Sequence, residues 1–115
     1  MRILRLNNDL CELAQIGDSY EDRCAEIGYS SAAVAPLGRT LRMVMANDFF
    51  RTHEESSINH PASQVFLHKG GKFIIYGCAF LCSIDEHKGI LCDLTDEDYE
   101  TAAKVLRSYG YVKGD

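Results

Sequence analysis

A long apolar run in the second half of the chain is its most informative pattern. If the run is extended, the odd-numbered residues from Phe73 to Leu81 point to one face and the even-numbered residues from Ile74 to Ile84 to the other, and both sets are almost entirely apolar. A strand with one face in water would instead alternate between apolar and polar residues. The pattern predicts a strand over residues 72–84 that is covered on both faces, either by helices of the same chain or, on one side, by a second subunit.

Three segments begin with the side-chain spacing of a helix N-cap. Thr95 stands three residues before Asp98, and Gly110 supplies a stop after an apolar face of helical period. The same spacing, followed by a glycine, recurs at Asp9 and at Ser19. The pattern predicts helices over residues 9–17, 19–28 and 95–110.

The pattern over residues 39–52 fits two elements. Leu41, Val44 and Phe49 recur at helical spacing, whereas Leu41, Met43 and Met45 also alternate as they would in a strand. The wide apolar arc favours a helix over 39–52, and a strand over 41–46 is the alternative.

Short strand and turn signals occupy the rest of the chain. Gly70 and Gly71 both tolerate the positive φ of a two-residue hairpin turn. The sequence therefore predicts one α+β domain over residues 1–115, with N-terminal helices, a three-stranded antiparallel meander and a C-terminal helix packed on the sheet. The remaining assignments are an opening strand at 3–6, a connector at 29–38, a polar loop at 53–63, strands at 64–69 and 90–93, and a loop at 85–89.

Composition and charge narrow the class of partner. The 115 residues are 46% hydrophobic and 25% charged, with a net charge of −5, which is typical of a soluble globular domain. Six basic residues face nine acidic ones in 1–57, and six face eight in 58–115. Since neither half supplies a basic surface, the sequence predicts no nucleic-acid partner and no anionic membrane partner. A basic protein partner or a small apolar ligand fits the charge.

The cysteines and the N-terminus indicate a compartment. The five cysteines are an odd number, no signal-peptide pattern opens the chain, and no apolar run reaches the roughly 20 residues of a membrane span. We therefore expect a cytoplasmic protein with reduced thiols and no membrane segment.

One cysteine pattern resembles a metal motif. Cys78, Cys82, His87 and Cys92 differ by one residue in spacing from a zinc knuckle, and four such donors suit tetrahedral zinc. In an extended strand, however, Cys78 and Cys82 would lie ~13 Å apart, too far for one ion. The sequence thus favours ordinary core cysteines, and it predicts neither a metal nor another cofactor.

A polar segment after residue 52 carries the candidate acid–base chemistry. His53, Glu54, Glu55 and His60, with His68 further along, could form a general acid–base pair. The ordinary interpretation is a solvated loop, and the second histidine of the pattern H-E-x-x-H is replaced by Ser57.

Apolar candidates for a ligand pocket come from the predicted helix over 39–52 and the predicted strand over 72–84. Met45 and Phe49, with Tyr76 and Phe80, could line a site between the helical layer and the sheet. At this spacing such residues are more often simple core.

The sequence as a whole predicts a small acidic, non-catalytic binding module. We expect it to act as a homo-oligomer, with a dimer as the first expectation, and to take a protein partner or a small apolar ligand. In composition it is similar to small acidic immunity and antitoxin-type proteins, which implies a basic protein partner. The alternative is a small enzyme with a pocket between helix and sheet that uses the His and Glu residues named above.

Overall fold

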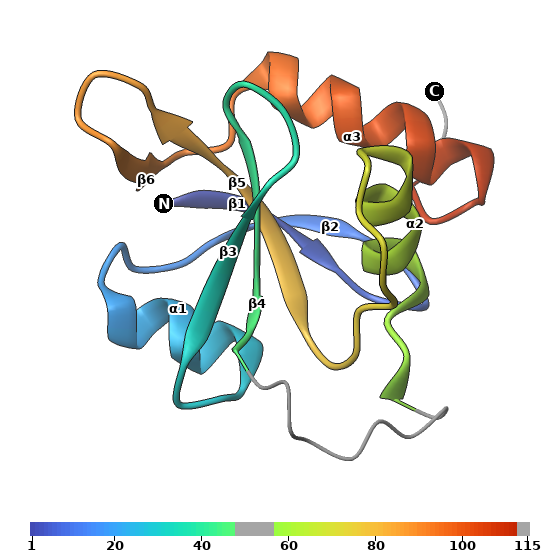
Figure 1. The fold of residues 1–115 in the computed structure, drawn as a ribbon, viewed down its shortest axis with the longest axis horizontal. Coiled ribbons are helices and arrows are strands. Elements are labelled where there is room, and N and C mark those ends of the chain that lie inside the picture. Colours follow the sequence, from blue (N-terminus) through green and yellow to red (C-terminus); the bar gives the residue numbers. More distant parts are fainter. Residues whose placement is uncertain (48–56, 113–115) are drawn as a thin grey trace.

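Three helices and a six-stranded antiparallel sheet make up the computed structural model, which describes residues 1–47 and 57–112 (Figure 1). The strand order is β2-β1-β5-β4-β3, and β6 pairs with the end of β5. The elements are β1 (Arg2–Leu6), β2 (Glu12–Gln15), α1 (Tyr20–Ile27), β3 (Ala32–Pro36), β4 (Leu41–Ala46), α2 (His60–His68), β5 (Ala79–Asp85), β6 (Ile90–Cys92) and α3 (Asp96–Ser108).

Strand β5 lies at the centre of the sheet and is covered on both faces. Leu81 packs in a core with residues of α2 and α3, while Phe80 and Cys82 pack in a second core with Ile27 of α1. None of the three β5 side chains is exposed to solvent. The prediction of a doubly covered apolar strand is confirmed for β5, and the cover comes from the same chain, so this strand does not by itself require a second subunit.

The helix starts at Ser19 and Thr95 are confirmed. The Ser19 side chain accepts from the backbone N–H of Asp22, and Gly28 ends α1 in the left-handed conformation with φ 69°. The Thr95 side chain accepts from the N–H of Asp98 in the same way. No helix of the described residues is both long and apolar enough to cross a bilayer.

Residues 41–46 form strand β4, so the predicted helix over 39–52 is wrong there and the alternative strand is correct. Leu41 and Met43 face the core under α2 and α3, whereas Val44 faces the core under α1. A strand between two layers buries successive residues on opposite faces. This arrangement explains the alternation over residues 41–46 that the sequence offered as the alternative to a helix. Residues 48–52 lie outside the described part.

Two further segments expected to be helix or connector are edge strands. Residues 12–15 pair with β1, and residues 32–36 pair with β4. The predicted helix over 9–17 and the connector over 29–38 are therefore wrong. Both strands are short and pair with the adjacent strand of the chain, so their extended form depends on that pairing more than on the pattern of their own residues.

The predicted strand over 64–69 is helix α2. Asn59 caps this helix by accepting from the N–H of Ala62, and Pro61 lies in its first turn. Gly70 has φ 93°, and a Cβ on Gly71 would lie 2.2 Å from the Phe66 ring. The two glycines thus follow the end of α2, where Gly71 packs against the ring of Phe66 in the last turn, and they do not form a hairpin.

The predicted strand over 72–84 begins only at Ala79. Before it, Ile75 bonds to α2, because its N–H donates to Ser63 Oγ at 2.8 Å and its carbonyl accepts from the N–H of Asn59 at 2.8 Å. Gly77 then turns the chain with φ 78°. The three-stranded meander is accordingly replaced by the larger sheet, in which only the predicted strands at 3–6 and 90–93 and the end of the long strand keep their places.

Candidate functional site

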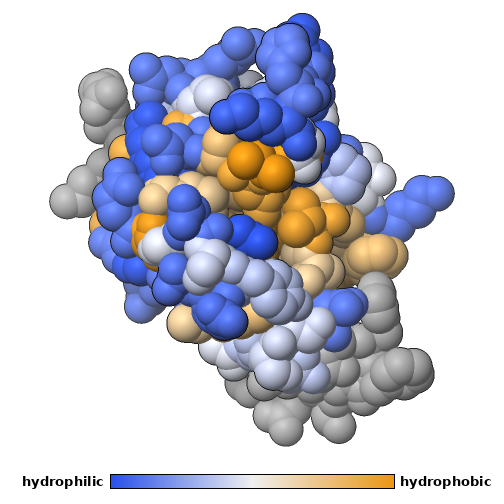
Figure 2. All heavy atoms as spheres, turned by 90° about the vertical axis from the view of Figure 1, so that its left-hand side faces the viewer, coloured by the Kyte–Doolittle hydropathy of each residue, from blue (hydrophilic) through white to orange (hydrophobic). Residues whose placement is uncertain are grey.

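A groove lies between the β5–β6 hairpin and the segment that leads into α1. It has a volume of about 380 Å3 and is open to solvent. Figure 2 looks onto this side of the molecule and shows hydrophobic surface surrounded by hydrophilic side chains. We call the groove between the hairpin and this segment the acidic groove. Its lining residues are Met1, Asp18, Asp85, Lys88, Ile90, Leu91, Cys92 and Asp93.

The hairpin turn fixes one carboxylate of the acidic groove. Asp85 Oδ1 accepts from the backbone N–H of His87 at 2.9 Å and of Lys88 at 3.1 Å. These bonds favour the ionised form, and the bond from Lys88 is the largest cause of the lowered pKa of Asp85. Asp85 therefore remains negatively charged in the groove at neutral pH.

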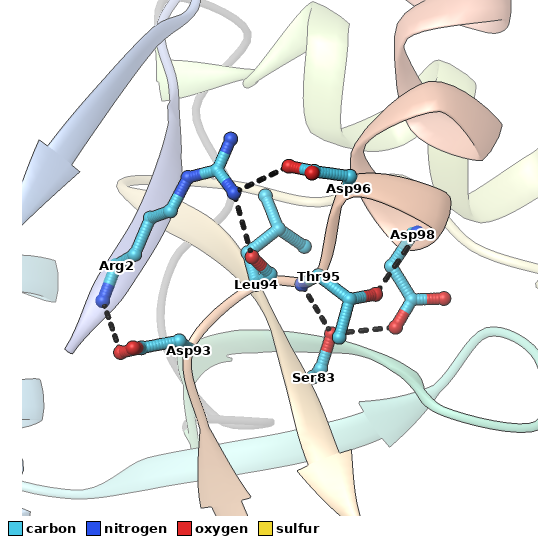
Figure 3. Close-up of polar contacts among 7 residues, drawn as sticks. All are labelled: Arg2, Ser83, Asp93, Leu94, Thr95, Asp96 and Asp98. Atoms are coloured by element: carbon cyan, nitrogen blue, oxygen red, sulfur yellow. Dashed lines mark hydrogen bonds and ion pairs between the residues drawn. The ribbon is translucent and has the colours of Figure 1, made fainter.

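A second carboxylate is held where β6 meets β1. Asp93 Oδ1 accepts from the backbone N–H of Arg2 at 2.8 Å, while the Arg2 guanidinium turns away to Asp96 at 2.9 Å (Figure 3). The charge of Arg2 is thus directed at Asp96. The third carboxylate, Asp18, has no hydrogen-bond or ion-pair partner within residues 1–47 and 57–112.

Strand β6 supplies the apolar part of the acidic groove. Ile90 is 56% exposed, and Leu91 beside it is half-buried. An isoleucine that remains this exposed gives up most of the free energy that burial of its side chain would contribute, about 1.5–3 kcal/mol. The groove therefore combines uncovered apolar surface with three carboxylates and a single lysine.

A buried polar cluster joins the sheet to α3 behind this groove. Ser83 Oγ donates to Asp98 Oδ2 at 2.5 Å, and Thr40 Oγ1 donates to the same oxygen at 2.7 Å. The N–H of Thr95 in turn donates to Ser83 Oγ at 3.1 Å (Figure 3). Ser83 is completely buried, so the cluster holds α3 on β5 and offers no accessible nucleophile.

The predicted acid–base residues do not come together in the described part of the chain. His60 begins α2 and His68 ends it, which separates them by ~12 Å along the helix axis. Both are exposed, and His68 Nε2 contacts the Tyr109 hydroxyl at 3.3 Å. His53, Glu54 and Glu55 lie outside the described residues.

The predicted ligand-pocket residues are divided between the two faces of the sheet. Met45 packs against the core under α2 and α3, whereas Phe80 belongs to the core under α1. Tyr76 is half-buried and forms an isolated β-bridge with Ile58. Phe49 lies outside the described residues. A second open hollow, of about 520 Å3, lies along α1 and is lined mainly by Tyr20, Cys24 and Tyr29 with their neighbours.

The zinc-knuckle candidates are spread over the β5–β6 hairpin. Cys78 is exposed before β5, Cys82 is buried on the α1 side, His87 is exposed in the turn and Cys92 is half-buried on β6. Within the described ranges, no three His, Cys, Asp or Glu side chains are grouped so that they could hold a metal ion.

The buried Cys82 thiol gives a prediction for alkaline pH. Burial raises its pKa from 9.0 to about 12, so the unfolded state loses this proton first as the pH rises. Stability that is complete below about pH 9 should therefore fall by at most ~1.4 kcal/mol per pH unit between about pH 9 and 12. Urea unfolding of the wild type and of Cys82→Ala at several pH values should show the steeper fall only in the wild type, and parallel profiles would contradict it.

The acidic groove was not predicted from the sequence, although local signals for part of it are present. An aspartate two residues before the His87-Lys88-Gly89 turn is a common turn-capping arrangement, and an apolar strand follows that turn directly. What the sequence does not indicate is that Asp18, far away in the chain, lies on the other side of the same groove.

Comparison of the chain with protein-family models, with curated proteins and with solved structures found no match in any of the three.

Proposed function

We propose that the protein is a non-catalytic binding module whose acidic groove takes up a basic segment of a protein partner. The observation that carries the proposal is the presence, in one groove, of the exposed Ile90 of β6 and the carboxylates of Asp18, Asp85 and Asp93. An apolar centre with a polar rim is the usual arrangement of a protein-binding surface.

The charge of the groove supports a basic partner. Among the described residues, Lys88 is the only basic side chain that lines it. The Met1 ammonium is engaged with the Ile16 carbonyl, and the guanidinium of Arg2 is directed at Asp96 outside the groove. The whole chain carries a net charge of −5, which attracts a basic partner over long distances.

The shape of the groove supports a protein segment over a small apolar ligand. Small-molecule sites enclose most of the ligand surface, whereas this groove is open along its length. At the centre of the sheet, Val44, Phe80 and Leu81 are fully buried by their neighbours and are not open to a ligand from solvent.

The placement of the polar residues favours binding over the enzyme alternative. His60 and His68 lie at opposite ends of α2, and the Ser83–Asp98 pair is sealed between β5 and α3. Acid–base catalysis needs such groups within hydrogen-bond reach of one reacting atom.

We infer a reducing, cytoplasmic setting for this module. All five cysteines are free thiols, and two of them, Cys11 and Cys82, are buried. Free cysteines inside a small core are typical of proteins that are kept reduced.

Calorimetry with a short peptide of alternating lysine and leucine tests the proposal. We expect the double variant Asp18→Asn with Asp93→Asn to weaken binding about tenfold, because each carboxylate contributes up to about 1 kcal/mol to a pairing at the surface. Ile90→Ser should weaken binding as well, since it removes exposed apolar surface from the groove.

A matched control separates the groove from the overall charge. Asp9→Asn with Glu97→Gln removes the same two charges from exposed positions outside the groove and should change the dissociation constant less than threefold. Equal weakening by both double variants, or no binding of the peptide to the wild type, would refute the proposal.

A further inference from the structure

The outer edge of β2 carries unpaired backbone groups. Ile16 N–H donates to the Met1 carbonyl at 3.0 Å, and the Met1 amino group donates back to the Ile16 carbonyl. Since hydrogen-bonded and non-hydrogen-bonded pairs alternate along an antiparallel ladder, Leu13 and Gln15 turn their N–H and C=O groups away from β1. Neither residue finds a partner for these groups within the described part of the chain.

A bond at the beginning of the same edge confirms this orientation. Cys11 lies two residues before Leu13, and its N–H donates outward to the Tyr111 carbonyl at 2.8 Å. The segment after α3 therefore covers the first position of the edge and leaves Leu13 and Gln15 open.

The opposite edge of the sheet, along β3, is blocked at two of its three outward N–H positions, and only Val34 keeps an outward N–H without a partner in the described residues. The Leu37 N–H donates to the Leu41 carbonyl, so Leu37 turns its backbone groups toward β4. Because the direction alternates along the strand, Ala32, Val34 and Pro36 turn theirs outward. The Ala32 N–H donates to the Tyr20 hydroxyl at 3.0 Å, and proline has no N–H to offer. Blocked groups and proline are the usual means by which proteins prevent pairing at a sheet edge.

Strand β2 has none of these protections. It contains neither proline nor lysine, and the Leu13 side chain is 46% exposed. Its one charged residue, Glu12, is engaged with Arg5 of the neighbouring strand at 3.1 Å. The edge is therefore short but open, with two donors and two acceptors in a row.

We propose that a second copy of this chain pairs with β2 in antiparallel fashion, about a two-fold axis at Ala14. In this register Leu13 of each protomer lies opposite Gln15 of the other, and the two residues exchange both backbone bonds, so that the dimer gains four. Glu12 then lies opposite Ile16, which keeps the two carboxylates apart. This self-complementarity favours a second copy as the occupant.

Sedimentation equilibrium tests the dimer. We expect about 26 kDa for the wild type at tens of micromolar, twice the 12.9 kDa of the chain, and about 13 kDa for Gln15→Pro, which removes an outward N–H without removing a bond to β1. Val34→Pro is the matched control, because it removes an outward N–H from the other edge and should remain a dimer.

A second variant and a second measurement keep the test decisive. Leu13→Lys introduces the kind of charge that protects natural sheet edges, and it should reduce the mass of the dimer to that of one chain. This variant provides the test if Gln15→Pro fails to fold. Hydrogen exchange should show slow amides at Leu13 and Gln15 in the wild type and at least tenfold faster exchange in Leu13→Lys. A wild type of about 13 kDa, an assembly larger than a dimer, or a dimer that persists in Leu13→Lys would overturn the proposal.

Discussion

Replacing Phe80 with alanine is expected to lower the free energy of unfolding by about 4 kcal/mol. Phe80 lies on the central strand opposite Val44, is completely buried, and packs with Ile27 and Cys82 in the core under α1. The substitution removes a large apolar side chain and leaves a cavity that the neighbouring strands cannot fill without breaking their ladders.

Urea unfolding monitored by circular dichroism measures this cost, and Phe73→Ala is its control. Phe73 carries the same side chain but is 59% exposed, with a contact to Phe66 at 5.4 Å between ring centroids. Its loss should cost about 1 kcal/mol or less. Similar costs for the two variants would contradict the assignment of β5 as the strand covered on both faces.

Replacing Asp98 with alanine is expected to cost about 3 kcal/mol. The Asp98 carboxylate accepts hydrogen bonds from Ser83 and Thr40, and the substitution leaves both hydroxyl groups without this charged acceptor. Ser83 Oγ is fully buried, so water cannot replace the lost partner without opening the contact between α3 and β5.

The neighbouring Asp96 provides the control for Asp98→Ala. Asp96 pairs with Arg2 at 2.9 Å, but its side chain is 95% exposed, and such surface ion pairs contribute about 1 kcal/mol or less. A double-mutant cycle with Ser83→Ala should show a coupling of more than 1 kcal/mol. Independent, additive effects of Asp98→Ala and Ser83→Ala would contradict a shared buried cluster.

Helix starts were predictable because their signals are local. The hydroxyl groups of Ser19 and Thr95 bond within their own first turns, so spacing alone identifies them. Asn59 and Pro61 gave an equally local signal for α2, which the sequence reasoning overlooked in favour of a strand at 64–69. At Asp98, by contrast, the side chain bonds to Ser83, a residue of another element, which the local spacing does not indicate.

The centre of the sheet could not be predicted because β5 pairs with two strands that lie far from it in the chain, β1 and β4. The small residues of β3 and the mixed residues of β2 become strands through their neighbours β4 and β1. The alternation over residues 41–46 was visible, but it could not be distinguished from helical spacing until β3 and β5 were placed on either side.

The candidate site was predictable in its chemistry but not in its position. The net charge left a basic protein partner and a small apolar ligand as alternatives, and we propose the first of these for the acidic groove. Its position depends on the fold, which brings Asp18 to the β5–β6 hairpin, and charge counts along a sequence contain no such information.

Backbone amide shift mapping by NMR with the lysine–leucine peptide tests most directly whether the acidic groove is the binding surface. We predict saturable shifts at residues 88–93 and at Asp18, with the dissociation constant found by calorimetry. Shifts centred on the exposed Leu67, Phe73 and Tyr109, or spread evenly over the acidic residues of the chain, would contradict it.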